Sequence, residues 1–291
     1  MTLLDSPIDK IKFENQSFLL KRDDLLSDDF SGNKARKLYY FLNNEFPHIK
    51  TIVSYGSNQS NAMYSLSVLA KLKNWNFIYY CDHIPSVLKE NPSGNYKYAL
   101  HNGMQIKTLK ENQTIEDINF DKDSTLFIKE GGALQEAQEG IKLLAKEIQE
   151  YKVTSNIKKL KVFLPSGTGT TALFLQKYLE DEVLTCPCVG DSLYLKKQFL
   201  ELESNSNHHP TVIDTKRKYH FGKLYKENYI LWKKLKEETN IEFDLLYDPI
   251  GIETFLNLQK DHETSYLYIH QGGLKGNETM IQRYNYKYPN L

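Results

Sequence analysis

The hydrophobic and polar positions of this chain switch repeatedly between two patterns. Short apolar runs such as Thr51–Tyr55 are typical of buried strands, and apolar side chains at three- and four-residue intervals, as between Met63 and Ala70, are typical of helices. The same patterns predict further strands at 77–81, 104–109, 125–128, 161–164, 183–189, 211–213, 243–247 and 266–270, and further helices at 96–101, 133–151, 172–179, 192–202, 224–238 and 252–258.

This order of elements predicts the α/β class. Strands separated by helices form mainly parallel, twisted sheets with helices on both faces. With 291 residues the chain exceeds the usual size of one domain, so we expect two. In such sheets, ligands bind outside the carboxyl ends of the strands, and the loops at those ends therefore carry most of the functional information.

Composition narrows the possible functions. The 37 basic residues are balanced by 37 acidic ones, so no basic excess indicates binding to nucleic acid or to an anionic membrane surface. The three cysteines are too few for a disulfide framework, and we expect no metal site. No targeting segment and no long uncharged apolar run is visible. We therefore expect a soluble, cytoplasmic protein.

The most informative loop follows the strand predicted at 161–164. Its glycines let the backbone approach an anion closely, its threonine hydroxyls can donate hydrogen bonds, and the next helix directs its positive end towards the same point. The spacing matches neither a Walker loop nor a dinucleotide-binding loop. The loop is either a phosphate cup or an ordinary strand-to-helix turn; its residues are Gly167, Thr168, Gly169, Thr170 and Thr171.

A second polar loop precedes the helix that contains Met63. Gln59, Ser60 and Asn61 offer amides and a hydroxyl at a helix start, which suit a carboxylate on one side and a phenolic oxygen on the other. Serine and asparagine are also common helix N-caps, so this loop alone is weak evidence of a site.

One lysine stands at the first turn of a predicted helix, directly after the turn Ser31-Gly32. Apolar positions from Ala35 to Phe46 have helical spacing, and Lys34 lies beside that face. Partial burial near the positive end of a helix would favour its neutral amine, which can form a Schiff base with a carbonyl. The simpler interpretation is that Lys34, Arg36 and Lys37 form a solvated face.

Paired glycines follow two further apolar strands, in Glu130-Gly131-Gly132 and Gln271-Gly272-Gly273. Each pair either lies at the site or is only a tight turn. His270, at the end of an apolar strand, is interpreted as a hydrogen-bonded core residue.

Taken in order, these segments resemble the 1-aminocyclopropane-1-carboxylate deaminase and D-cysteine desulfhydrase family, which belongs to the tryptophan-synthase-β-like (fold type II) pyridoxal phosphate enzymes. The resemblance covers nearly the whole chain. It rests on Lys21-Arg22-Asp23-Asp24, Gly32-Asn33-Lys34-Ala35-Arg36-Lys37-Leu38, Gln59-Ser60-Asn61, Glu130-Gly131-Gly132, Gly167-Thr168-Gly169-Thr170-Thr171, Tyr247-Asp248-Pro249 and His270-Gln271-Gly272-Gly273.

The resemblance implies pyridoxal 5'-phosphate as cofactor and a small amino acid as substrate. Lys34 would carry the cofactor and move a proton. Ser60 would hold the substrate carboxylate, together with Gln59 and Asn61, and would be a second catalytic residue, since it matches a serine proposed as a nucleophile in some members. Asn61 would also bond the phenolic oxygen, and residues 167–171 would hold the phosphate. It also implies a homodimer. Each chain would have a larger cofactor-binding domain (1–38 with 151–291), a smaller inserted α/β domain (39–150), and an active site in the cleft between them.

The implied reaction is D-cysteine desulfhydration to pyruvate, ammonia and sulfide. Ring-opening deamination of 1-aminocyclopropane-1-carboxylate and a cofactor-binding protein without catalysis are the alternatives. Two departures bear on this choice, because the family pattern has tyrosine where this chain has Gly251, and a ring-nitrogen partner where it has Ile252. A shift in local alignment would bring Glu253 or Thr254 to the ring nitrogen instead. Ala62 replaces a commonly polar residue.

Overall fold

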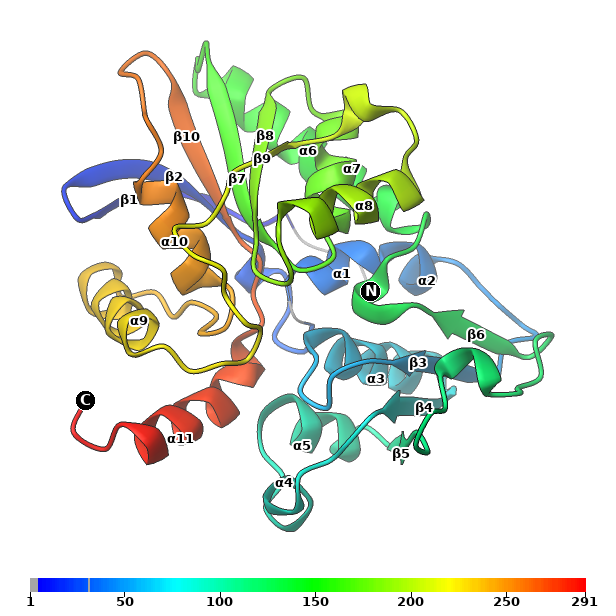
Figure 1. Cartoon of the computed structure of the whole chain (residues 1–291). Helices are drawn as coiled ribbons and strands as arrows, with labels where there is room; N and C mark the ends of the chain where they lie inside the picture. The colour runs from blue at the N-terminus through cyan, green and yellow to red at the C-terminus, as the bar shows by residue number, and fades with distance from the viewer. Residues whose placement is uncertain (1–4, 31) are drawn as a thin grey trace.

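The structure is a computed structural model that describes residues 5–30 and 32–291, so Ser31 of the predicted glycine turn lies outside the described residues. The described strands form two sheets (Figure 1). The larger sheet has the order β1 (Ile8–Phe13), β2 (Gln16–Arg22), β10 (Ser265–His270), β7 (Leu160–Ser166), β8 (Glu182–Pro187) and β9 (Thr211–Val212). The smaller sheet has the order β5 (Met104–Thr108), β4 (Asn76–Cys81), β3 (Thr51–Tyr55) and β6 (Thr125–Ile128).

All strand pairs in these sheets are parallel except β1 with β2, which form an antiparallel hairpin at one edge. Helices form most of the crossovers between parallel strands, as such connections require. The helices of the described residues are α1 (Asn33–Lys37), α2 (Tyr39–Asn43), α3 (Asn61–Lys73), α4 (Ser86–Glu90), α5 (Gly94–His101), α6 (Ala137–Thr154), α7 (Thr170–Tyr178), α8 (Ser192–Leu202), α9 (Lys226–Thr239), α10 (Asp248–Leu256) and α11 (Asn277–Lys287).

The larger sheet is buried on both faces because alternate side chains of its central strands serve two different cores. On β7, Val162 and Leu164 pack into a core with α6 and α7, whereas Phe163 packs into a core with α9 and α10. This period of two is the geometry of an extended strand. The carboxyl ends of β7 and β10 are thereby fixed at one edge, from which the glycine-containing loops emerge.

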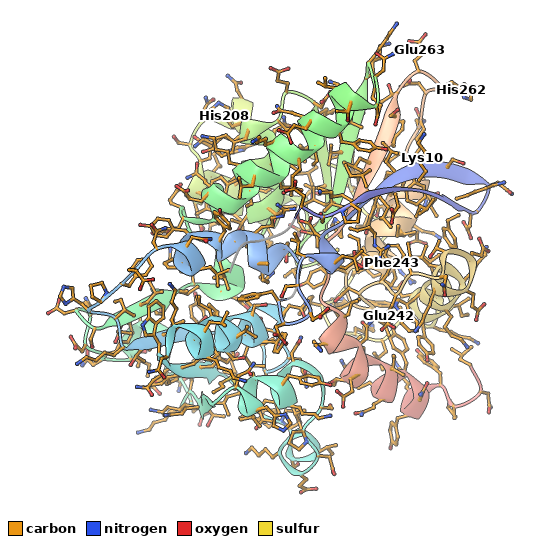
Figure 2. The ribbon with its side chains drawn as sticks, turned by 180° about the vertical axis from the view of Figure 1, so that it is seen from behind. Lys10, His208, Glu242, Phe243, His262 and Glu263 are labelled. Atoms are coloured by element: carbon orange, nitrogen blue, oxygen red, sulfur yellow. The ribbon has the colours of Figure 1, made fainter. Side chains whose placement is uncertain are left out.

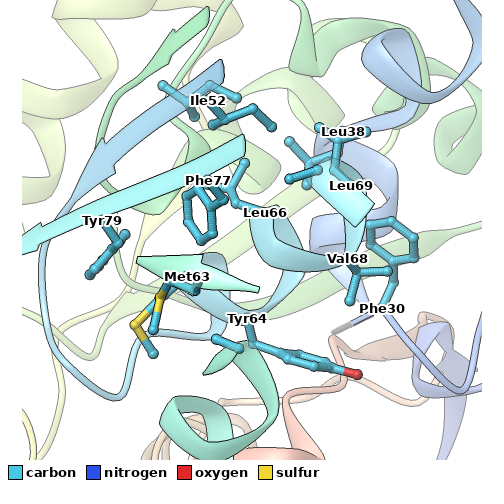
Figure 3. Packing of buried hydrophobic residues seen from close by; sticks show 14 of the residues in the cluster. Phe30, Leu38, Ile52, Met63, Tyr64, Leu66, Val68, Leu69, Phe77 and Tyr79 are labelled. Carbon is cyan, nitrogen blue, oxygen red and sulfur yellow. The ribbon is translucent and has the colours of Figure 1, made fainter. Parts of the chain in front are cut away.

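The smaller sheet has its own core, shown in close-up in Figure 3. Met63, Leu66 and Leu69 of α3 pack against Ile52 and Phe77 of the sheet. Val68 and Leu69 of α3 also lie in the same cluster as Leu38 and Phe30. The start of α3, which bears Asn61, is therefore held between the smaller sheet and the segment that carries α1.

Most elements predicted from the sequence are present, and the predicted class of two mainly parallel sheets flanked by helices is confirmed. The strand predicted at 243–247 is wrong, because this segment forms a turn that leads into α10. The continuous helix predicted from Lys34 to Phe46 is also wrong, since it breaks at Leu38 into α1 and α2. The domain limits 1–38 with 151–291, and 39–150, remain a prediction.

A buried network of charged side chains anchors α1. Arg36 is fully buried, and its guanidinium donates to Asp23 Oδ1 at 2.8 Å and to Glu147 Oε1 at 2.5 Å. Lys21, on β2, donates to Glu147 Oε2 at 2.5 Å. Burial acts to raise the pKa of Asp23, but the adjacent Arg36 charge outweighs it and the pKa falls. The predicted solvated face of Arg36 and Lys37 is therefore wrong.

Among the helices of the described residues, none has the length and apolar character needed to cross a membrane.

Replacing Arg36 by alanine should lower the free energy of unfolding by about 3–5 kcal/mol, because it leaves two buried carboxylates with only Lys21 as partner. Lys146→Ala is the matched control, since Lys146 pairs with Glu150 on the surface and its loss should cost under about 1 kcal/mol. Urea unfolding of both variants provides the measurement. Equal effects of the two substitutions would contradict the anchoring role of Arg36.

Candidate active site

One cavity of about 170 Å³ lies at the carboxyl ends of β7 and β10 and is bordered by the starts of α1, α3 and α7. The structure brings every site residue predicted from the sequence to its wall. They are Lys34, Gln59, Ser60, Asn61, Gly167, Thr168, Gly169, Thr170 and Thr171.

Lys34 reaches this cavity because it lies on the face of α1 opposite to Arg36. Residues two apart on a helix point to nearly opposite sides, so Arg36 enters the buried network while Lys34 faces the cavity. The Lys34 Nζ donates to Asn33 Oδ1 at 3.2 Å. Burial lowers the pKa of Lys34 to about 8, although the negative charge of Asp244 partly opposes the shift. A larger share of neutral, nucleophilic amine is therefore present near neutral pH than for an ordinary lysine.

The loop predicted as a phosphate cup opens into the cavity at the N-terminus of α7. Gly169 has φ of 74° and precedes the first helical residue, and a side chain there would collide with Phe199 and Leu195. The Thr168 and Thr170 hydroxyls are 3.1 Å apart. The free N–H groups and positive end of α7 therefore face a space bounded by hydroxyls, which suits an anion.

Lys37 is a second lysine of this cavity, and the sequence analysis did not assign it to the site. It is one helical turn from Lys34, and its Nζ donates to Gly131 O at 3.0 Å. Gly131 in turn lies against Thr168 of the loop. Burial, followed by the nearby Lys34 charge, lowers the pKa of Lys37 well below its ordinary value. Within residues 5–30 and 32–291, no carboxylate pairs with it, so a bound anion would be its natural partner.

The opposite wall is the start of α3. Ser60 is the N-cap of this helix, and its Oγ accepts hydrogen bonds from the N–H groups of Ala62 and Met63. The Ser60 side chain also hydrogen-bonds the Tyr79 hydroxyl. Asn95 Nδ2 donates to Asn61 Oδ1 at 2.7 Å, which fixes the Asn61 amide with its NH₂ group as the donor towards the cavity. Such a donor fits a phenolic oxygen.

The turn before α10 supplies a residue that the sequence analysis missed. Figure 2 shows Glu242 and Phe243 from behind, beside the start of α11. Asn277, the first residue of α11, donates to Glu242 Oε1 and to Phe243 O, each at 2.9 Å, and accepts from Leu245 N at 2.8 Å. This anchored turn places Asp244 in the cavity wall. The incorrect strand assignment at 243–247 concealed it.

Asp244 is a buried carboxyl that accepts hydrogen bonds from backbone N–H groups and from Asn61. Its Oδ1 accepts from the backbone N–H groups of Leu246 and Tyr247, at 2.8 and 2.6 Å. Burial and the neighbouring Asp248 charge raise the pKa of Asp244 to about 7, while hydrogen bonds from Tyr247, Leu246 and Asn61 oppose the shift. Asp244 therefore exchanges a proton near neutral pH, beside both Lys34 and Asn61.

Residues 251–254, where the chain departs from the family pattern, lie outside the wall of the cavity. Gly251 and Ile252 are buried in α10 and do not line the cavity. Glu253 accepts from the Tyr219 hydroxyl at 2.6 Å, and Thr254 donates to Ile250 O. The predicted alternative, in which Glu253 or Thr254 reaches the ring nitrogen, is therefore wrong.

Tyr247 lines the cavity one helical turn before Gly251. Its hydroxyl lies 3.3 Å from where a side chain on Gly167 would begin. A side chain at Gly251 would instead meet the Tyr268 hydroxyl at 2.5 Å. Tyr268 donates to Asp248 Oδ1 at 2.7 Å, so the volume beside Gly251 is already filled. In this chain the aromatic wall of the cavity is supplied by Tyr247.

The motif Gln271-Gly272-Gly273 contacts the segment at the start of α1. Asn33 N donates to Gln271 O at 2.9 Å, and Gln271 Nε2 donates to Pro165 O at 2.6 Å. Gly32 has φ of 33°, and a side chain there would lie 1.9 Å from Gln271 O. His270 is fully buried and its Nε2 lies 2.8 Å from Glu242 O, which confirms the prediction of a hydrogen-bonded core residue.

No family model and no curated protein sequence matches the chain. Solved structures do match it in three dimensions. An ACC deaminase homologue is 19% identical, with 96% of this chain and 93% of that chain covered at a TM-score of 0.77. A hydrogen sulfide-producing enzyme from Fusobacterium nucleatum is 12% identical, with 93% of this chain and 96% of that chain covered at a TM-score of 0.63. Threonine deaminase isoform 2 from Solanum lycopersicum is 13% identical, with 93% of this chain and 84% of that chain covered at a TM-score of 0.63.

The chain has the architecture of fold type II pyridoxal phosphate enzymes. The resemblance predicted from the ordered motifs is thus confirmed for the fold. The cavity also fits the cofactor of this fold by its chemistry. It combines a lysine whose pKa is lowered, a loop suited to an anion, a buried lysine without an acidic partner and a fixed amide donor. Lys34, residues 167–171, Lys37 and Asn61 would hold pyridoxal phosphate.

The lowered pKa of Lys34 should be visible in the pH dependence of its reaction with the cofactor. The rate at which cofactor-free protein forms a covalent adduct with added pyridoxal phosphate should rise with pH, reach half of its maximum near pH 8 and level off above that, because the neutral amine is the reacting species. An ordinary lysine would reach half of its maximum only near about pH 10.4. Adduct absorbance in stopped-flow provides the rate. In Asp244→Asn the plateau should begin at lower pH, because the carboxylate that favours the ammonium is gone.

Lys34→Arg should remove this phase. Burial also lowers the pKa of Lys260 to about 8, so Lys260→Arg is the control and should leave the phase unchanged. A plateau above pH 10 would contradict the burial of a reactive Lys34.

Filling the space at Gly251 should destabilise the fold. Gly251→Ala places a methyl group 2.5 Å from the Tyr268 hydroxyl and 3.0 Å from Pro165, which should cost about 1–3 kcal/mol. Combining it with Tyr268→Phe should recover part of that cost, because the closest atom is removed. A double-mutant cycle in urea measures the coupling. Strictly additive effects would show that the two positions do not compete for this volume.

Proposed function

We propose that this protein is a pyridoxal-phosphate-dependent lyase or deaminase that acts on an amino acid, with β-elimination from D-cysteine as the leading reaction. One observation carries the proposal: Lys34, with its lowered pKa, shares a single cavity with the anion-binding loop and with the Ser60–Asn61 helix start. The resemblance to the deaminase and desulfhydrase family supports this class of reaction, as does the similarity in fold to an ACC deaminase homologue and to a hydrogen sulfide-producing enzyme.

When bound, pyridoxal phosphate supplies an electron sink for a carbanion at the substrate α-carbon. The chain supplies binding and proton transfer. The N–H groups at the start of α7 would hold the phosphate, Lys37 would donate to it from the same wall, and Asn61 would donate to the phenolic oxygen. Gln59, Ser60 and the N-terminus of α3 bind the substrate carboxylate, which places the α-carbon beside Lys34.

Lys34 Nζ, once its amine is free, accepts the α-proton of the substrate. For D-cysteine the Cβ–S bond then breaks, and its electron pair leaves with sulfur, which takes a proton to become hydrogen sulfide. The remaining 2-aminoacrylate is hydrolysed by one water to pyruvate and ammonia. Asp244 is a further acid in the cavity wall, and its pKa of about 7 suits proton transfer at neutral pH.

The test is turnover of D-cysteine by purified protein with cofactor, measured as pyruvate and sulfide in equal amounts. Lys34→Ala should abolish both the visible absorbance of a lysine-bound cofactor and the turnover. Ser60→Ala is the comparison variant, and it should keep that absorbance while raising the KM. A reducible covalent adduct in Lys34→Ala would overturn the assignment of Lys34. Cofactor binding without turnover across D- and L-amino acids would favour a binding protein instead.

A further inference from the structure

A second cavity, of about 270 Å³, lies next to the cofactor cavity, and we call it the side chamber. The two cavities share part of their walls, including Asn61, Asp244 and Leu246. The remaining wall of the side chamber is formed by Asn95 of α5 and by the first turns of α11 up to Arg283. A group attached to a substrate in the cofactor cavity can therefore enter the side chamber past Asp244.

The volume of the cofactor cavity favours a substrate that extends into the side chamber. The cofactor cavity, at about 170 Å³, is smaller than the roughly 300 Å³ at which ordinary ligand pockets begin. Pyridoxal phosphate and the amino and carboxyl groups of a substrate would fill it. A substrate with a substituent larger than a thiol needs additional space, and the side chamber supplies it.

The frame of the side chamber is built from specific contacts between α5 and α11, which run side by side in Figure 1. The Ser93 and Thr279 hydroxyls are 2.8 Å apart, and Lys97 forms an ion pair of 3.1 Å with Glu278. On the inner side, Asn95 is almost fully buried and holds Asn61. These contacts keep the two helices at a fixed separation, so the side chamber is a defined space.

The charges in the side chamber are arranged along its length. Asp244 lies on the wall shared with the cofactor cavity, whereas Arg283, whose side chain is exposed to solvent, lines only the side chamber. The Arg283 guanidinium donates to Gly222 O at 2.8 Å and contacts Met280 Sδ at 3.4 Å. Throughout the described chain, no Asp or Glu lies within ion-pair distance of it. The far end therefore carries a positive charge with donors to spare, which favours an anionic ligand.

We propose that the side chamber binds the β-substituent of the substrate, and that the preferred substrate is an amino acid whose β-substituent ends in an anion paired with Arg283. This inference rests on the proposed function, because it assumes that the amino-acid head lies at Lys34. The reaction is the β-elimination already given. The α-proton goes to Lys34, the Cβ–S electron pair leaves with an extended thiolate that takes a proton from water, and one water completes hydrolysis to pyruvate and ammonia.

A pair of nearly isosteric substrates tests the charge. S-carboxymethyl-cysteine and S-carbamoylmethyl-cysteine differ by a carboxylate in place of a neutral amide, and both enantiomers of each are assayed for pyruvate with the cofactor-loaded protein. We expect kcat/KM to be about tenfold higher for the carboxylate, as for a partly solvated charge-assisted pair. Arg283→Gln should abolish the preference. Lys287→Gln, an exposed change of the same charge on the same helix, should leave it intact.

A binding measurement separates this inference from the proposed function. 2-Aminoadipate has the shape of S-carboxymethyl-cysteine and no leaving group, so titration calorimetry compares it with its side-chain amide whether or not turnover occurs. Tighter binding of 2-aminoadipate, lost in Arg283→Gln and kept in Lys287→Gln, supports the side chamber even if no substrate turns over. Equal binding of the two compounds, or a preference that survives in Arg283→Gln, overturns it. In that case D-cysteine turnover would still support the proposed function.

Discussion

The buried ion network around Arg36 is the constraint on which the site depends. It joins β2, the segment after it, α6 and α1 through side chains that are almost completely removed from water. Such a network tolerates little displacement, because any uncompensated charge in this environment is costly. Since Lys34 and Arg36 point to nearly opposite sides of one short helix, fixing Arg36 also fixes the direction of Lys34. A five-residue helix would not hold a reactive lysine in place by its own hydrogen bonds.

The cavity combines two electrostatic environments on opposite walls. On the side of α1 and α7, two lysines with lowered pKa lie near helix N–H groups and threonine hydroxyls. On the side of the turn before α10, Asp244 is a carboxyl whose pKa is raised to about 7. Neighbouring groups whose environments shift their pKa values towards neutrality are a common basis of acid–base chemistry. The side chamber beyond Asp244 then adds a positive charge at Arg283, so the charges alternate from the phosphate end to the far end of the substrate space.

The wall of the cavity differs from the family pattern at the positions that the resemblance singled out. The expected tyrosine position is Gly251, whose neighbouring volume is occupied by the Tyr268 hydroxyl. Tyr247, one turn earlier, faces the cavity instead. Ile252 belongs to the core, so the acid nearest the cavity on this side comes from the turn at Asp244. The lysine, the anion-binding loop and the amide donor all line the cavity, whereas Gly251 and Ile252 do not.

The sequence alone determined the elements whose signal is local. Strands such as 51–55 and the loop 167–171 follow from apolar periodicity and glycine placement, and the ordered motifs identified the fold. Tertiary structure decided the rest. Arg36 and Lys37 are buried only because distant strands and loops surround them, which no helical periodicity encodes. Asp244 lies in the cavity wall because Asn277 holds the turn that carries it. The two residues are more than thirty positions apart, so the local sequence pattern does not predict this contact. The pKa values, the filled space at Gly251 and the position of Arg283 likewise depend on contacts between segments far apart in the chain.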